Sequence, residues 1–354
     1  MTMKFLYTIV FVLVFQFANA QVAGTQIVNN ALFAKFRLSV TVNSTSSITF
    51  NLDVVGGAGQ ITQVGVVYGI AKGLTTESTL YKPSAATPTF GTRIATISYS
   101  GPTSTTLTVS STETVNSQGT NTFFITPYYA RLYAIKNGAT FYGPEIEFLP
   151  NWPTVSEPGT GKSWCAANLG ALSVATSSTD SDSYGFLYQW GRGTDGHQFR
   201  NSNIPTTTTL SSGDNPGNGA FITNSSTGNW RNPANNLLLW KGVNGTNNPC
   251  PSGWRIPTKL EWYSFMRNNS GNNSLVIRNS LAFGSILKVP ASQSRHRNTA
   301  VVNSVNHNFL WMMNWSEGLG GHGAWNMTFY ADGWYEGNGG GGESFGGAIR
   351  CIQD

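Results

Sequence analysis

The sequence predicts a β-rich protein in two parts: an all-β sandwich over residues 21–150, followed by an α+β, loop-rich domain over 151–354. Short β-branched segments of alternating polarity fill the first part. Glycine, asparagine and tryptophan dominate the second part, where regular segments are short. The proline-bearing stretch FLPNWPTVSEPGTGKSW, around 148–164, marks the boundary.

Composition limits the classes of protein this chain can belong to. Charged residues make up only 10% of it, against about 25% in ordinary soluble proteins. Disorder is nevertheless not expected, because 11 Trp, 20 Phe and 13 Tyr supply ample apolar surface to bury. The net charge is +5, but the basic residues are scattered. Nucleic acid requires a clustered basic patch, so we expect no nucleic-acid partner.

The first twenty residues, MTMKFLYTIVFVLVFQFANA, have the pattern of a secretory signal peptide. Lys4 gives the positive start, an apolar run covers 5–17, and the small residues at 18–20 form a cleavage signal. No cysteine follows the run, which argues against a lipoprotein, and no other apolar stretch predicts a membrane span. We therefore expect an exported protein that is extracellular, at the cell surface or in the periplasm.

Six segments of the first part alternate as strands do. They are KFRLSVTV (35–42), SITFNLDVV (47–55), QVGVVYGI (63–70), RIATISY (93–99), TTLTVS (105–110) and YYARLYAI (128–135). In the last segment Ala130, Leu132 and Ala134 are predicted to face the core, and the face with Tyr129 and Tyr133 is expected to be open to solvent.

The stretch YYARLYAIKNGATFYGPEIEF ends the first part and resembles the last hairpin of fibronectin type III-like modules. This resemblance implies an immunoglobulin- or fibronectin III-like sandwich. The sequence indicates no site in this part, so we expect it to be a spacer.

A capping box predicts a helix after the stretch NPCPSGWRIP, residues 248–257. The Thr258 hydroxyl can accept from the backbone N–H of Glu261, and the Glu261 carboxylate can reach back to Thr258. Trp262, Phe265 and Met266 then form an apolar stripe at helical spacing, so the helix is predicted to pack inward.

Only three cysteines occur, at Cys165, Cys250 and Cys351, and they lack the close spacing of zinc ligands. For an exported chain, one disulfide and one leftover thiol are expected. A Cys250–Cys351 bridge would tie the last strand to the approach of the helix. It would close a loop of about 100 residues, which stabilises a fold by up to roughly 4–5 kcal/mol.

Five ordered motifs in 155–354 resemble the Fibrobacter succinogenes major paralogous domain. They are WCAANLGA (164–171), SYGFLYQWGRGTDGHQ (183–198), NPCPSGWRIPTKLEW (248–262), LKVPA (287–291) and GGAIRCIQD (346–354). The resemblance implies a C-type-lectin-like fold, related to formylglycine-generating enzyme domains, in which a small sheet joins the two ends of the domain. Cys165 stands where the family usually has an apolar residue, which implies a buried free thiol. LWMMNWS (310–316) is bulkier than the family pattern.

Catalysis is not expected from the motifs present. The formylglycine-generating relatives need two nearby reactive cysteines, and Cys351 has no second cysteine close to it in sequence. The four histidines lack ligand spacing, and neither G-x-S-x-G nor H-E-x-x-H occurs. Calcium lectins use E-P-N or Q-P-D with W-N-D, because Ca²⁺ requires six to eight oxygens. Neither motif is complete here, so no metal or other cofactor is predicted.

Calcium-independent recognition is the predicted function. The stretch LWMMNWSEGLGGHGAWNMTFYADGWYE (310–336) interleaves aromatics with glycine and polar residues, as recognition loops do. Trp325, Met327 and Phe329 alternate like the inward face of a strand, and the remaining aromatics are expected at the surface. The predicted ligand-binding residues are Arg295, His296, Arg297, Trp311, Met313, Trp315, Trp334 and Tyr335.

The partner is expected to be a glycan or a protein at a cell surface. One alternative is a structural cell-surface component without a specific ligand. Another is a receptor diversified by a retroelement that mutates adenines near the 3′ end of the gene. Asn codons altered in this way yield Arg or His, as at Arg295 and His296, but never Trp or Met, as at Met312 and Trp315.

Overall fold

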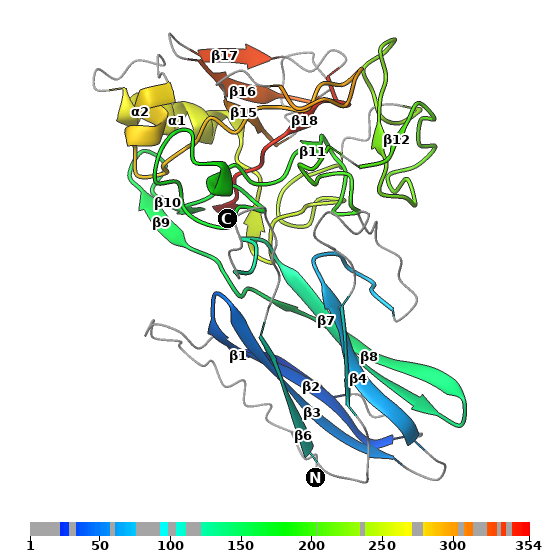
Figure 1. Ribbon diagram of the computed structural model, residues 1–354. Helices are drawn as coiled ribbons and strands as arrows, with labels where there is room; N and C mark the ends of the chain where they lie inside the picture. The colour runs from blue at the N-terminus through cyan, green and yellow to red at the C-terminus, as the bar shows by residue number, and fades with distance from the viewer. Residues whose placement is uncertain are drawn as a thin grey trace, which may run out of the picture.

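The fold is rich in β-strands and has few helices, as the sequence predicts (Figure 1). The computed structural model describes residues 22–27, 33–56, 61–75, 93–97, 104–110, 122–202, 204–233, 238–270, 279–303, 308–313, 324–330, 334–337 and 342–354. The predicted signal peptide, 1–20, lies outside these residues. No helix in the described ranges has the length and apolarity needed to cross a membrane.

The N-terminal half consists of two four-stranded antiparallel sheets. One has the order β1-β2-β3-β6, with β1 Val22–Ile27, β2 Phe33–Ser44, β3 Ser47–Gly56 and β6 Ser104–Ser110. The other has the order β5-β4-β7-β8, with β5 Arg93–Ile97, β4 Ile61–Gly69, β7 Tyr128–Lys136 and β8 Ala139–Phe148. All six predicted strand segments are therefore strands.

Alternating apolar residues of the two sheets share one core. Val40 of β2, Phe50 of β3, Val66 of β4 and Leu132 of β7 are buried in a single cluster. Burying every second residue of a strand puts its apolar side chains on one face, which is why these segments alternate. The predicted core face of β7 is confirmed, since Ala130, Leu132 and Ala134 are all buried.

The expectation that the other face of β7 is open to solvent is wrong. Tyr129 is only 5% exposed and Tyr133 is fully buried. The Tyr133 hydroxyl accepts a hydrogen bond from the Gln63 amide of β4, at 2.6 Å. Burial, together with the carboxylates of Glu147 and Glu145, raises the pKa of Tyr129. Tyr129 and Tyr133 are therefore buried on this face of β7 as well. The sequence of a single strand does not reveal which distant residues will bury it.

The C-terminal half combines small sheets with long loops. Its largest sheet has the order β14-β19-β10-β9, with β9 Thr154–Glu157, β10 Lys162–Cys165, β14 Trp254–Arg255 and β19 Ile352–Gln353. A three-stranded sheet consists of β15 Asn308–Trp311, β16 Asn326–Phe329 and β17 Trp334–Gly337. Two short pairs complete it: β11 Tyr188–Gln189 with β18 Gly346–Gly347, and β12 Thr206–Thr207 with β13 Phe221–Ile222.

The predicted helix is α1, Lys259–Asn269, and its capping box is confirmed. The backbone N–H of Glu261 donates to the Thr258 hydroxyl at 3.2 Å, and the Thr258 N–H donates to the Glu261 carboxylate at 2.8 Å. Trp262, Phe265 and Met266 are fully buried, in a core shared with β10 and β16. Beside α1 lie α2, Asn279–Gly284, and the strands β15 to β17 (Figure 1). A 3-10 turn, Ser181–Ser183, lies in the loops.

The expected disulfide is confirmed. Cys250 is bonded to Cys351, and their Cα atoms are 5.9 Å apart across a sequence separation of 101 residues. Cys165 is the free cysteine and is buried, as the resemblance implied. Burial raises the pKa of the Cys165 thiol to about 11, although Arg350 favours the thiolate. The thiol is therefore protonated and shielded at neutral pH.

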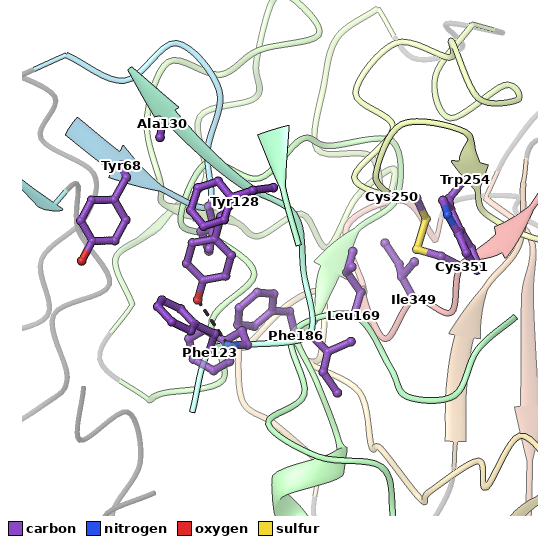
Figure 2. Packing of buried hydrophobic residues seen from close by; sticks show 14 of the residues in the cluster. Tyr68, Phe123, Tyr128, Ala130, Leu169, Phe186, Cys250, Trp254, Ile349 and Cys351 are labelled. Atoms are coloured by element: carbon purple, nitrogen blue, oxygen red, sulfur yellow. Dashed lines mark hydrogen bonds between the residues drawn. A yellow bond between two sulfur atoms is a disulfide. The ribbon is translucent and has the colours of Figure 1, made fainter. Parts of the chain in front are cut away.

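The segment before β7 joins the two halves. The Ile125 N–H donates to the Ala171 carbonyl, and the Gly170 N–H donates to the Ile125 carbonyl, both at 2.7 Å. The ring of Phe124 packs on Phe186, with centroids 5.0 Å apart. Figure 2 shows Phe123 and Phe186 close together here, with the Cys250–Cys351 disulfide beside Trp254 in another part of the same cluster. Gly170 has φ +83°, and a Cβ at this position would lie 2.2 Å from the Phe186 ring, so only glycine fits this approach.

Candidate functional site

Arg295 was predicted to bind ligand at the surface, but the structure places it in the core. Its side chain is 1% exposed and stacks on the ring of Phe221, at 5.5 Å from the guanidinium carbon to the centroid. The guanidinium donates to the carbonyls of Ala300 (2.7 Å) and Phe199 (2.8 Å). Burial lowers the pKa of Arg295 to about 10. The surface assignment of Arg295 is therefore wrong: it holds two loops together.

Trp311 is also a core residue, contrary to its predicted exposure. It is fully buried at the end of β15, and its indole N–H donates to the Tyr188 carbonyl at 2.6 Å. The backbone of Gly347 lies against it, since a Cβ on Gly347 would come within 2.7 Å of the indole nitrogen. Trp311 therefore stabilises the packing of the core and is not available at the surface to bind a ligand.

His296 and Arg297 are neighbours in the sequence, and both side chains lie against the ring of Phe345. The His296 and Phe345 ring centroids are 5.5 Å apart, and the Arg297 guanidinium lies 5.5 Å from the same Phe345 centroid. The half-buried ring of Phe309 borders Phe345 at 5.9 Å. All four side chains are partly exposed. We call His296, Arg297, Phe309 and Phe345 the Phe345 patch.

The other predicted residues do not join this patch in the described structure. Met313 packs against the core that contains Phe124 and Phe186, where its sulfur accepts a hydrogen bond from the Gly242 N–H at 3.1 Å. Trp315 lies outside the described residues. For Trp334 and Tyr335 only the backbone is described: β17 pairs them with Phe329 and Thr328 of β16. Met327 and Phe329 of β16 are buried, as their alternation predicted. Trp325 is half-buried against the core that α1 shares with β10 and β16.

A cavity of about 570 Å³ lies where the two halves meet, and the sequence did not predict it. The N-terminal half contributes three residues and the C-terminal half three loops. The lining residues are Ile70, Lys72, Tyr129, Gly193, Thr194, Asp195, Asp214, Asn215, Pro216, Val243, Asn244, Gly245, Asn247, Asn248, Pro249, Cys250, Pro251, Ser252 and Gly253. We call this the junction cavity. The N-terminal half therefore contributes to a concave site, which its expected role as a spacer did not include.

Fixed side chains hold the loops around the junction cavity. The Glu147 carboxylate of β8 accepts from the Ser252 N–H (2.8 Å) and the Ser252 hydroxyl (3.1 Å), which ties the two halves together. The Asn247 amide donates to the carbonyls of Gly191 (2.9 Å) and Asp214 (2.7 Å). Cys250, in the wall, is fixed by its disulfide. The cavity is therefore preformed rather than assembled on binding.

Asp195 connects the junction cavity to a buried polar cluster. Its carboxylate pairs with the Arg192 guanidinium at 2.6 Å and with His197 Nδ1 at 2.5 Å. His197 Nε2 accepts from the Gln189 N–H at 2.9 Å, so the neutral imidazole carries its proton on Nδ1 and donates it to Asp195.

The pKa values follow from this geometry. Burial would raise the pKa of Asp195, but Arg192 and His197 hold it at about 2. Burial and the nearby Arg192 charge lower the pKa of His197 to about 4, although Asp195 opposes them. The cluster thus contains an ionised carboxylate and a neutral imidazole near pH 7. It has the Asp–His part of a triad, but in the described structure both histidine nitrogens are engaged and no hydroxyl or thiol nucleophile bonds to the imidazole.

Two of the sequence motifs supply much of this cavity. SYGFLYQWGRGTDGHQ (183–198) provides Gly193, Thr194 and Asp195, and NPCPSGW (248–254) provides most of the opposite wall. In the sequence these motifs carried only the resemblance to a known family. The cavity also requires Tyr129 and Lys72, which belong to the N-terminal half and are distant from both motifs in the sequence.

Metal ligands do not gather in the described residues: no three His, Cys, Asp or Glu side chains lie close enough to hold an ion. Comparison with protein-family models, with curated proteins and with solved structures finds no match to this chain.

Proposed function

We propose that this chain is an exported, non-catalytic binding protein. In this proposal residues 151–354 form a C-type-lectin-like domain of the Fibrobacter succinogenes major paralogous type, carried on a fibronectin III-like module. The pairing of β10 with β19, Trp164 opposite Ile352, supports this assignment because it joins the two ends of the domain in one sheet. The domain recognises a glycan or a protein at a cell surface without calcium.

The Phe345 patch is the observation that carries this proposal. A partly exposed aromatic ring flanked by a guanidinium and an imidazole is typical of recognition surfaces. The patch also has a rigid base: the N–H of Arg295, next to His296, donates to the Gly346 carbonyl at 2.8 Å, and Gly346 donates back at 2.9 Å. A rigid base limits the entropy lost on binding.

Binding of the secreted full chain to a panel of glycans and bacterial cells, with and without EDTA, tests the proposal. We expect an EDTA-insensitive ligand whose affinity falls on the order of tenfold in Phe345→Ala or Arg297→Gln, the loss of about one good contact. Leu260→Ala, at an exposed position of α1, is the matched control and should bind normally.

Two outcomes would contradict the proposal. Binding abolished by EDTA would mean that calcium is needed, and binding unchanged in both patch variants would place the site elsewhere. Absence of any ligand across the panel would favour the alternative of a structural surface component.

A further inference from the structure

We propose that the junction cavity is a second binding site, and that it takes an uncharged sugar, such as the end of a neutral glycan chain. This site is separate from the Phe345 patch and does not depend on it. The inference rests on the size of the cavity, the cancellation of charge in its walls, the amides that line it and the two halves that form it.

The size is that of a small-molecule site. A cavity of about 570 Å³ falls within the range of roughly 300–1,000 Å³ that small-molecule pockets occupy. The loop 248–253 in its wall is held by the Cys250–Cys351 bond and by the hydrogen bonds of Ser252 to Glu147. A preformed site of this size has room for one or two sugar rings.

Both acidic residues in the lining, Asp195 and Asp214, form ion pairs with arginines that are not part of the lining. Asp195 pairs with Arg192, whose side chain is fully buried, and all the described contacts of its two oxygens are to Arg192 and His197. Asp214 pairs with Arg231, whose side chain is 9% exposed, at 2.5 Å. Lys72 is the one lining residue of positive charge; it is exposed, and its ammonium lies 5.3 Å from the Tyr129 ring centroid. The walls therefore present little net charge, which favours an uncharged ligand over an anion or a cation.

Amide groups supply the hydrogen bonds that such a ligand needs. Both amide hydrogens of Asn247 are used inside the protein, which leaves its Oδ1 fixed as an acceptor with no partner in the described chain. Asn215 uses its Oδ1 on the Gly217 N–H (2.9 Å), so its NH₂ group is the part left for a ligand. Asn244 is exposed and has both groups to offer. Sugar hydroxyls donate and accept at once, and this mixture of donors and acceptors matches them.

Apolar surface lies between these amides. Ile70 and Tyr129 of the N-terminal half line the cavity together with Pro216, Val243, Pro249 and Pro251 of the C-terminal half. Sugar rings carry apolar C–H faces as well as hydroxyls, so a wall that contains both apolar and amide groups suits them. A purely apolar ligand would instead leave the Asn247 oxygen buried without a partner, at a cost of about 1–3 kcal/mol.

Saturation-transfer NMR on the secreted full chain tests this site. The probes are neutral mono- and disaccharides, together with their sulfated and uronic-acid counterparts. We expect at least one neutral sugar to bind. The double variant Asn215→Ala/Asn244→Ala should weaken it on the order of tenfold or more, because both side chains are exposed and removing them spares the internal bonds of Asn247. Asn43→Ala, at an exposed position of β2 outside both surfaces, is the matched control.

The outcomes separate this site from the Phe345 patch. Loss of sugar binding in the cavity variant but not in Phe345→Ala or Asn43→Ala supports the inference. Loss in Phe345→Ala with normal binding in the cavity variant would overturn it while supporting the patch. Binding of only the charged sugars, or of none of the probes, would also overturn it. Circular dichroism of each variant checks that the fold is retained.

Discussion

Buried Trp and Arg side chains in the C-terminal half hold its loops by donating hydrogen bonds to backbone carbonyls. The indole N–H groups of Trp190, Trp230, Trp240 and Trp311 donate to the carbonyls of Met312, Trp190, Asn247 and Tyr188. The Arg350 guanidinium donates to the carbonyls of Cys165 (3.1 Å) and Leu287 (2.8 Å). Loop carbonyls lack the partners that a strand ladder supplies, and buried carbonyls need partners. This accounts for a tryptophan-rich chain with few ion pairs.

Titration of His197 makes the free energy of unfolding depend on pH, and a variant at this position can measure its share. Its pKa is about 4 when folded and near 6.5 in an ordinary setting. Between these values the unfolded chain binds a proton that the folded chain does not, so the free energy of unfolding falls as pH drops from 6.5 to 4. The difference corresponds to on the order of 3 kcal/mol. Glu343 acts in the opposite sense, because burial raises its pKa to about 7.

A comparison of variants separates these two contributions. His197→Gln keeps a donor and an acceptor but does not titrate. We expect it to lose less stability than the wild type between pH 7 and pH 4.5, measured as the free energy of unfolding in urea. Equal losses in the two proteins would show that His197 does not contribute to the pH dependence.

Among the elements, α1 and the last strand are linked by charge as well as by the disulfide. The Arg255 guanidinium of β14 binds the Glu261 carboxylate of α1 (2.7 Å) and the Asp354 carboxylate after β19 (2.8 Å). Because Glu261 also closes the capping box, one carboxylate connects the helix start to the sheet. These contacts place the helix against the edge of the sheet, close to the disulfide.

Reduction of the Cys250–Cys351 bond should lower the melting temperature by several degrees. Opening a loop of this length costs about 2–5 kcal/mol, mainly because the unfolded chain gains freedom. Cys250→Ser should reproduce the effect, and Cys165→Ala should keep the dependence on reductant. Cys165 should react with an alkylating reagent only after unfolding, because it is 1% exposed. Peptide mapping that finds Cys165 in a bridge would contradict this account.

At the scale of the whole molecule, the two halves share a core. One cluster of buried residues runs from Val40 and Phe50 of the N-terminal sheets through Phe124 and Phe186 to Cys351 near the C-terminus. The Asn151 amide adds hydrogen bonds across the junction, to the carbonyls of Phe123 (3.1 Å) and Leu172 (3.2 Å). Chains of this length usually unfold domain by domain, but a shared core couples the domains.

The two halves should therefore unfold in one transition. All 11 tryptophans lie between residues 152 and 334, so tryptophan fluorescence reports only the C-terminal half. Phe50→Ala creates a cavity in the N-terminal core at a cost of about 3–5 kcal/mol. We expect it to lower the midpoint measured by fluorescence as well as by circular dichroism, whereas the exposed control Asn43→Ala should not. A fluorescence midpoint unmoved by Phe50→Ala would mean that the halves unfold independently.

The sequence by itself determined the local structure. The alternation in 35–42 and 47–55 specified strands, because a half-buried strand has a side-chain period of two. Thr258 and Glu261 specified the start of α1 for an equally local reason, since both partners lie within one helical turn. The positions of the cysteines predicted the Cys250–Cys351 disulfide. Of the residues predicted to bind ligand, His296 and Arg297 are consecutive in the sequence, and both lie against Phe345.

Only the tertiary structure decided which aromatic and basic residues are buried. Trp311 and Arg295 have the composition of a binding surface, but Tyr188 and Ala300 offer carbonyls that hold them inside. The junction cavity was likewise hidden, because Tyr129 and Asn247 are far apart in sequence and meet only when the two halves pack. Burial depends on contacts between distant segments, and the periodicity of a single segment does not encode them.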